Sequence, residues 1–213
     1  MRTVEQLLEE IRFNTNRINK NRFTDDSLIR LLNTAQRQIQ RLVFLSNPKA
    51  QHFTKDYIFD YNSNEEEYSL PAWAYIQNST FAVFPQIGED NLAPIPMIDE
   101  KERQYKAGYY VKGNKIYLPK GSVGASVSKI RAVLWKKLPE LSSISDVPDL
   151  PDACEDLLTL FVERKMHYID SSKDINNSAI FTSEEKAEIS SLFNNSSKDV
   201  NYPPVTDTTY FTY

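Results

Sequence analysis

The chain has 213 residues, of which 40% are hydrophobic and 25% are charged, and its formal net charge is -4. These are ordinary values for a globular protein that is long enough to bury a sizeable core. The single cysteine excludes a disulfide within the chain and a thiolate zinc cluster, and the two histidines lack the spacing of a metal-binding pair. The five glycines form neither a GxGxxG motif nor a P-loop, so we expect no cofactor, no metal and no common nucleotide site.

Membrane and enzyme functions have no support in the sequence. No run of about 18 apolar residues could cross a membrane, and the first residues lack the pattern of a secretory signal. Neither His52 nor His167 lies in the sequence context of a catalytic triad. We therefore expect a soluble, non-enzymatic protein that is assembled inside the cell.

The net charge conceals a gradient along the chain. Residues 1–53 carry a net charge of +4, residues 54–148 carry -1, and residues 149–213 carry -7. Such asymmetry is compatible with a nucleic-acid surface or an acidic tail. It is equally compatible with packing of the first helices against the last ones, within one chain or between neighbours, and that interpretation requires no ligand.

Residues 1–53 are predicted to form two helices. In the first, apolar residues recur at the spacing of one helical face, namely Val4, Leu7, Leu8 and Ile11. The second helix begins at Thr24, whose hydroxyl can accept hydrogen bonds from the free amides of the first turn, while Asp25 and Asp26 complement the helix dipole. Its apolar stripe comprises Leu28, Leu31, Leu32, Ala35, Ile39 and Leu42.

Arg30, Arg37 and Arg41 lie nearly opposite this apolar stripe, within roughly 40° of one another at about 100° per residue. Three interpretations are open: a solvated face, a subunit contact, or a surface for nucleic-acid phosphates. We take the three arginines as candidates for a subunit interface.

Residues 54–140 are predicted to form an inserted β-rich region. Residues 57–61 and 65–70, joined by a turn at 62–64, suggest a hairpin, and a second hairpin is predicted around residues 112–114. Residues 127–138 suggest a strand that is covered in part on both faces. The aromatic residues between 105 and 117 suit either cross-strand pairs or stacking on bases or sugars. We expect five to seven strands in an antiparallel sheet or a small β-sandwich.

Residues 141–193 are predicted to supply the C-terminal helices. Pro151 suits the first turn of a helix, and Cys154 should be buried as a small apolar residue. The apolar face of this helix is predicted to comprise Leu157, Leu158, Phe161, Val162 and Ile169. Thr182 and Glu185 form the pattern of a capping box at the start of the last helix.

Residues 194–213 are rich in Asn, Ser, Pro and Thr, and could not by themselves bury enough surface to become ordered. Two interpretations are open, an extended arm that becomes ordered on a partner and plain disorder. The density of aromatic residues favours the arm. Its candidate docking residues are Tyr202, Pro203, Pro204, Val205, Tyr210, Phe211 and Tyr213.

Three segments carry a family resemblance through their order. The first contains Phe23, Thr24, Asp25, Leu28, Leu32, Asn33, Ala35 and Gln36; the second is Tyr68, Ser69, Leu70 and Pro71; the third is Leu150, Pro151 and Asp152. In this order they resemble the head-to-tail adaptor family of tailed bacteriophages, short-tailed type, whose members are also called tail accessory, connector or head-completion proteins. The similarity spans residues 1 to 170.

The resemblance implies a structural virion protein at the capsid–tail junction, present in the host cytoplasm during assembly. Such proteins form a ring, commonly of twelve copies, that docks on the portal protein, extends the DNA channel for genome ejection and receives the tail or further ring proteins. DNA would pass through the lumen without tight binding. Other interpretations are a different tail-module protein, such as a stopper or a receptor- or glycan-binding protein, and an enzyme or nucleic-acid binder.

Together, these segments predict an α+β fold. A helical bundle of about four helices, made of residues 1–53 and 141–193, is interrupted by the antiparallel β region and followed by an extended C-terminal arm.

Overall fold

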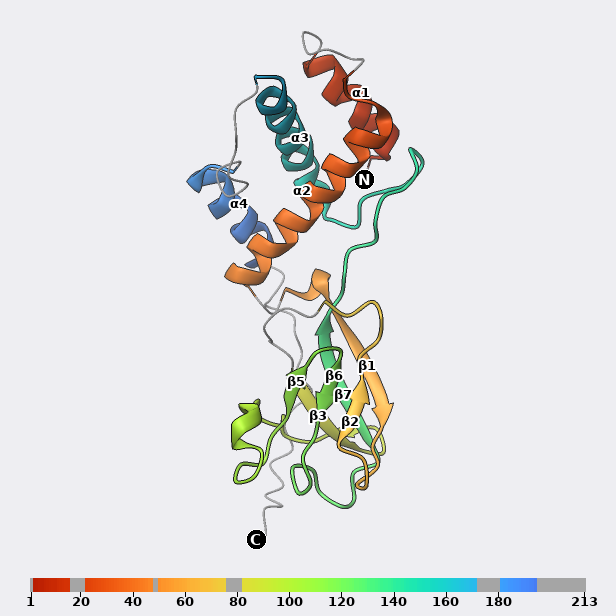
Figure 1. Cartoon of the computed structure of the whole chain (residues 1–213), viewed down its shortest axis with the longest axis vertical. Coiled ribbons are helices and arrows are strands. Elements are labelled where there is room, and N and C mark those ends of the chain that lie inside the picture. The colour runs from red at the N-terminus through yellow and green to blue at the C-terminus, as the bar shows by residue number, and fades with distance from the viewer. Residues whose placement is uncertain (1, 16–21, 48–49, 76–81, 172–180, 195–213) are drawn as a thin grey trace. The chain divides into compact units, whose positions relative to one another are not determined.

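The computed structural model describes residues 2–15, 22–47, 50–75, 82–171 and 181–194. These residues contain four α-helices and seven β-strands, and all pairings between the strands are antiparallel (Figure 1). The predicted α+β class is therefore confirmed. The chain divides into two compact units. The described residues of the helical unit fall within Met1–His52 and Leu138–Lys198, and those of the β unit fall within Phe53–Lys137.

The helical unit contains all four described helices. They are α1 (Val4–Asn14), α2 (Asp25–Ser46), α3 (Glu155–Asp170) and α4 (Ser183–Asn194). Thr3 caps α1 in a capping box with Gln6, and Thr24 caps α2 by accepting a hydrogen bond from the Ser27 N–H. Because each threonine satisfies an amide that has no partner within its helix, both predicted helix starts are confirmed.

The buried face of α2 organises the helical core, because it packs against α1, α3 and α4. Residues of the predicted stripe are fully buried on α2, namely Leu28, Leu32, Ala35 and Ile39. On α3 the same is true of Leu158, Phe161 and Val162. Ile169 was predicted to share that face, and this was wrong. It lies in the last turn of α3 with its side chain 37% exposed.

An ion pair joins α3 to the start of α4. Both guanidinium Nη atoms of Arg164 donate to the carboxylate of Glu185, each at 2.7 Å. The same carboxylate accepts a hydrogen bond from the Thr182 N–H at 2.8 Å, and the Thr182 hydroxyl accepts one from the Glu185 N–H at 3.2 Å. The predicted capping box is therefore present. Arg164 and the capping contact together hold the pKa of Glu185 below its ordinary value.

We expect Glu185→Gln to lower the free energy of unfolding of the helical unit at pH 7 by about 1 kcal/mol, because a charge-assisted bidentate pair is lost. The pKa of Glu185 is lowered in the folded protein, so its contribution is complete above the ordinary glutamate pKa of about 4.3 and is lost as the pH falls below it. Urea unfolding at a series of pH values, followed by circular dichroism, should show the two proteins converging in acid. A constant difference from pH 7 to pH 3 would contradict the assignment.

The β unit contains two sheets. The larger has the strand order β1-β7-β3-β4 and the smaller has the order β2-β6-β5. The strands are β1 (Thr54–Asp60), β2 (Glu67–Ser69), β3 (Ala82–Ile87), β4 (Asp90–Asn91), β5 (Tyr110–Lys112), β6 (Lys115–Tyr117) and β7 (Lys129–Trp135). Strand β7 lies between β1 and β3. Its Ile130, Ala132 and Leu134 are fully buried on one face, and Trp135 stacks on Phe53 on the other, so the prediction of cover on both faces is confirmed.

The first predicted hairpin was wrong in its pairing. The turn exists, because the Glu65 N–H donates to the Asn62 carbonyl at 2.9 Å. However, β1 pairs with β7, and β2 pairs with β6. The ring of Tyr68 lies 4.7 Å from that of Phe59 and 6.2 Å from that of Tyr61. The alternating aromatic residues therefore pack between the two sheets, and do not mark a ladder between β1 and β2.

The second predicted hairpin is confirmed. Strands β5 and β6 are joined by a turn in which Gly113 has a φ of +58°, a conformation that glycine adopts without strain. The rings of Tyr110 and Tyr117 stack across it with centroids 4.8 Å apart. The aromatic residues of this hairpin thus form a cross-strand pair, one of the two interpretations that the sequence left open.

Candidate interaction surfaces

The described residues hold no cluster with the composition of a metal site. Cys154 is buried as predicted, and burial raises the pKa of its thiol to about 12, so the thiol is not a nucleophile at neutral pH. His52 lies with its Nε2 3.0 Å from the Asp149 carbonyl oxygen, and His167 lies in the last turn of α3. The two histidines of the chain therefore have no shared site.

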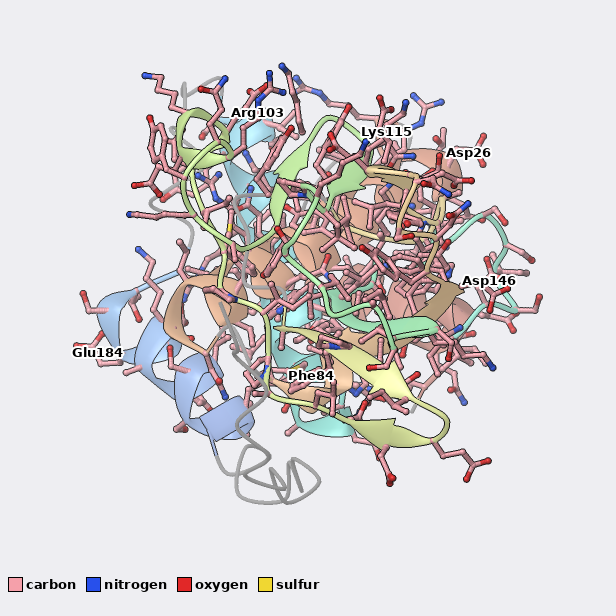
Figure 2. The ribbon with its side chains drawn as sticks, turned by 90° about the horizontal axis from the view of Figure 1, so that it is seen from below. Asp26, Phe84, Arg103, Lys115, Asp146 and Glu184 are labelled. Carbon is pink, nitrogen blue, oxygen red and sulfur yellow. The ribbon has the colours of Figure 1, made fainter. Side chains whose placement is uncertain are left out.

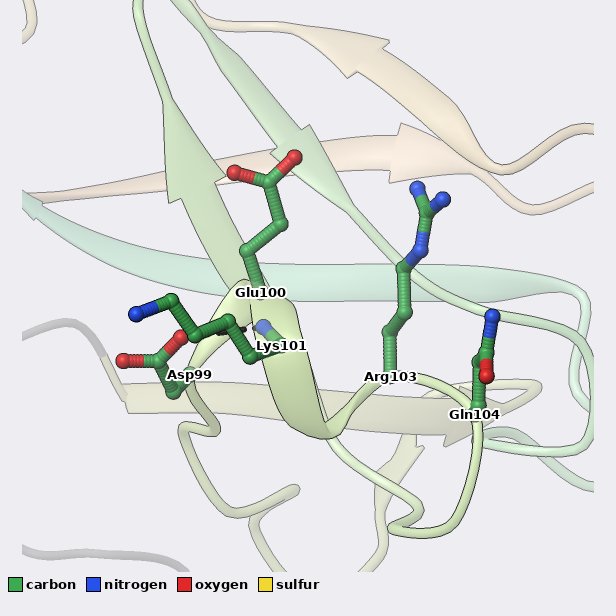
Figure 3. A pocket seen from close by; sticks show the side chains of 5 residues that line it. All are labelled: Asp99, Glu100, Lys101, Arg103 and Gln104. Carbon is green, nitrogen blue, oxygen red and sulfur yellow. Dashed lines mark hydrogen bonds between the residues drawn. The ribbon is translucent and has the colours of Figure 1, made fainter.

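An open hollow lies beside the short helical turn Glu100–Glu102 of the β unit. The side chains around it fan out from one turn and do not converge (Figure 3). The Asp99 carboxylate accepts a hydrogen bond from the Lys101 N–H at 2.9 Å, and Glu100 pairs with Lys112 at 2.7 Å. These acids cap the turn and anchor it to β5. The lining residues are Asp99, Glu100, Lys101, Arg103 and Gln104.

The asparagine of the first motif ties α2 to the segment that precedes α3. The Asn33 Nδ2 donates to the Leu141 carbonyl, and the Asn33 Oδ1 accepts from the Leu141 N–H, both at 2.8 Å. Leu141 is buried, with 4% of its surface exposed. One side-chain amide thus satisfies both backbone groups of a buried residue, which requires a donor and an acceptor on the same group. The motif is a structural clamp.

The second motif closes a turn and fastens a strand end. The Tyr68 hydroxyl accepts a hydrogen bond from the Asn62 N–H at 3.0 Å and lies 2.9 Å from the Asn62 carbonyl as a donor. The Leu70 N–H donates to the Asn114 carbonyl at 2.9 Å, and Asn114 Nδ2 donates back to the Leu70 carbonyl at 3.2 Å. In the third motif, the Pro151 carbonyl accepts from the Cys154 N–H at 2.8 Å and starts the turn that leads into α3. All three motifs therefore stabilise the fold.

Some of the oppositely charged residues from the two ends of the chain form ion pairs within one copy. The Arg2 Nε lies 2.6 Å from a carboxylate oxygen of Glu155, and its Nη2 lies 3.2 Å from Asp156. Arg22 lies 3.5 Å from Asp170. Basic residues near the start of the chain thus pair with acidic residues of α3, as one interpretation of the gradient predicted.

Arg30, Arg37 and Arg41 are all exposed on α2. Helical geometry places them roughly 120–180° from Leu28, Leu32, Ala35 and Ile39, the fully buried residues of the predicted stripe. Arg37 lies 3.3 Å from Glu140, but both side chains are more than half exposed, so this pair contributes little to stability. Arg30 and Arg41 make no ion pair with any residue that the structure describes. We call these three residues the α2 arginine stripe.

Helix α4 carries two exposed acids. Glu184 and Glu188 are exposed, whereas Ile189 and Phe193 are fully buried in the core beneath α2. Glu184 lies roughly 140–180° around α4 from those two buried residues, and it projects from the outer side of α4 in Figure 2. Neither acid has an ion-pair partner among the described residues. We call Glu184 and Glu188 the α4 acidic face. Glu184 lies on the outward side of α4, whereas Glu188 is close enough to the buried Cys154 for its charge to help raise the pKa of that thiol.

Two exposed apolar residues of the helical unit were missed by the sequence reasoning. Leu45 is 70% exposed one turn after Arg41, and Phe13 is 82% exposed near the end of α1. The sequence could have indicated their exposure, because both residues lie off the apolar stripe of their helix. Arginine beside an exposed leucine is a combination found at protein interfaces, where arginine is enriched and other charges are depleted.

The candidate docking residues of the C-terminal arm lie outside the residues that the structure describes. They are Tyr202, Pro203, Pro204, Val205, Tyr210, Phe211 and Tyr213.

Among the helices described, none is both long and apolar enough to span a membrane. A family model described as SU10 adaptor protein matches residues 2–207, nearly the whole chain. No curated protein matches the chain.

Proposed function

The chain belongs to the SU10 adaptor protein family, and we propose that it forms a ring that docks on the portal vertex of a phage capsid, extends the DNA channel and connects the capsid to the tail. The family is one of structural adaptors and not of enzymes, so the protein is a structural component of the phage particle. In this proposal the ring has twelve copies, belongs to a short-tailed phage and is assembled in the host cytoplasm. The protein has no catalytic activity.

The observation that carries the ring is the presence of two exposed, oppositely charged faces on the helical unit. The α2 arginine stripe and the α4 acidic face make no ion pair with each other among the residues that the structure describes. The stripe of one copy can meet the acidic face of the next copy. Contacts of this head-to-tail kind generate a ring when the rotation between copies closes.

The spacing of the charges suits such a contact. Arg37 and Arg41 are four residues apart on α2, and Glu184 and Glu188 are four residues apart on α4, so each pair spans about 6 Å along its helix. Two exposed arginines can therefore face two exposed glutamates in register. Leu45 would add apolar contact at one end of the same face.

In the proposed ring the residues divide by role. Residues 1–53 and 141–193 build the ring, residues 54–140 contact a neighbouring ring or the tail, and residues 194–213 form an arm that docks on a partner. DNA slides through the lumen, where tight phosphate binding would hinder it. A net charge of -4 is compatible with that requirement.

Reversing the arginine stripe should weaken ring formation. We expect R37E with R41E to reduce the fraction of rings formed with the cognate portal protein roughly tenfold, since like charges would then face each other across the contact. E184R with E188R should have the same effect, and mixing the two variants should restore mixed rings. Negative-stain electron microscopy and sedimentation velocity would measure both.

A matched control is E5R with E9R, which reverses two exposed acids four residues apart on α1. It should leave ring formation unchanged. Loss of rings in this control, or full ring formation by both single-sided reversals, would contradict the assigned faces. A wild-type protein that stays monomeric with portal would contradict the ring itself.

A further inference from the structure

Among the residues that the structure describes, no strand pairs with the outer edge of β1 in the larger sheet. The inner edge of β1 pairs with β7. At the two ends of this pairing, the Tyr61 N–H donates to the Ser128 carbonyl and the Phe53 carbonyl accepts from the Lys136 N–H. In an antiparallel ladder alternate residues bond to the same neighbour, so the odd-numbered residues of β1 face β7. The backbone N–H and C=O groups of Asp56, Ile58 and Asp60 therefore point away from the sheet.

This edge is longer than the other sheet edges that the structure describes. Strand β1 has seven residues, whereas the edge strands β2 and β5 have three each and β4 has two. It contains no proline, and Ile58 is 53% exposed. Natural sheets protect long edges with short strands, bulges, proline or charged side chains, and of these β1 has only charged side chains, at Lys55, Asp56 and Asp60. An open edge of this length is the geometry used for the addition of an extra strand.

The two faces of β1 differ in what a new strand would meet. Tyr57 and Phe59 lie on the face that packs against the β-unit core, with Tyr57 also near Trp73. Asp56 pairs with Arg131 on the opposite, exposed face at 2.9 Å. A fitting strand would therefore carry large apolar side chains at alternate positions and polar side chains between them.

We propose that β1 of one copy accepts residues 205–213 of a neighbouring copy as an additional strand. Eight of these nine residues are β-branched or aromatic, and none is glycine or proline. Val205, Phe211 and Tyr213 fall in one alternating register with Thr206, Thr208 and Thr212 in the other, whereas Asp207 and Tyr210 depart from this pattern. Pro203 and Pro204, a residue type that favours an extended backbone, precede the segment. The segment carries one charge, Asp207, so it adds little repulsion to the strand edge.

The length of the arm allows it to reach another copy. Residues 195–213 follow α4 and number 19, so they span up to roughly 60 Å when extended. This inference rests on the proposed ring, which keeps neighbouring copies at high local concentration. It assigns the arm to a second copy of the chain and not to the portal.

Cysteine cross-linking between two differently tagged full-length chains tests the strand. One chain carries I58C, and the other carries a single cysteine at Thr206, Asp207, Thr208, Thr209 or Tyr210. The native Cys154 is fully buried in both. In rings assembled on portal, a short bis-maleimide should link the two chains with a yield that alternates along the arm about fivefold, because side chains of a strand alternate between faces.

Two controls complete the design. I87C, an exposed isoleucine on β3 of the same unit, should give a low yield that does not alternate. I58P removes one N–H from the open edge without removing a bond to β7. A chain with both I58P and D60C should give a cross-link yield at least fivefold lower than a chain with D60C alone.

The outcomes separate this inference from the ring. Alternating links between the two tagged chains support it. Rings without such links, links confined to one chain, or links from the arm to portal alone overturn the strand addition and leave the ring standing. Failure to form rings overturns the proposed function itself.

Discussion

Replacing Asn33 with alanine is expected to lower the free energy of unfolding of the helical unit by about 2–4 kcal/mol. The side chain satisfies both the N–H and the C=O of Leu141 at 2.8 Å, and Leu141 is buried. Each buried polar group left without a partner costs about 1–3 kcal/mol, which outweighs the gain in helix propensity of about 0.7 kcal/mol. Urea unfolding followed by circular dichroism at 222 nm reports this unit, since it contains the four described helices.

The matched control is Gln38→Ala on the same helix, because Gln38 makes no side-chain hydrogen bond to any residue that the structure describes. It should change the free energy of unfolding by less than about 0.5 kcal/mol. Asn33→Asp keeps the acceptor but loses the donor, so its free energy of unfolding should lie between those of the control and the alanine variant. An alanine variant as stable as the control would show that the clamp does not support the fold.

Gly108→Ala is expected to destabilise the β unit by about 2–3 kcal/mol. A Cβ atom at this position would lie 2.4 Å from the Ile98 Cγ2 and 2.7 Å from the Pro96 carbonyl oxygen. The backbone cannot simply retreat, because the Ile98 N–H and the Tyr109 N–H bond across the same contact at 2.8 and 2.9 Å. Crowding in a packed interior typically costs 1–3 kcal/mol, roughly the range expected here.

Tryptophan fluorescence isolates this effect, because Trp73 and Trp135, the two tryptophans of the chain, both lie in the β unit. Gly124→Ala is the matched control, since nothing lies within 4 Å of the added Cβ and the backbone needs no positive φ. It should be neutral or slightly stabilising, by up to about 1 kcal/mol. Equal fluorescence transitions for the two variants would contradict the predicted clash.

The helix starts were predictable because their causes are local. Thr3, Thr24 and Thr182 each satisfy amides within three residues of themselves, so short sequence patterns contain all the necessary information. The sequence offered a cross-strand tyrosine pair in the β5–β6 hairpin as one of two interpretations of its aromatic residues. That pair was predictable because a tight turn with glycine fixes which residues face each other. The exposure of the α2 arginine stripe also followed from the helical period.

Long-range pairing was not predictable in the same way. Residues 57–61 and 67–69 are close in sequence, yet they belong to different sheets, because the aromatic side chains bury more surface between sheets than in a two-strand ladder. Asn33 was recognised as a motif residue, but its partner is 108 residues away. No local pattern identifies Leu141.

The sequence by itself determined the α+β class, the helix starts, the second hairpin, the charge gradient and the family resemblance, because each depends on neighbouring residues or on simple periodicity. Only the tertiary structure decided how the three motifs act, which charges pair within the chain and which stay free, and which strand keeps an open edge. These features depend on contacts between distant segments. The exposed charges of α2 and α4 and the outer edge of β1 are the surfaces from which the proposed assembly follows.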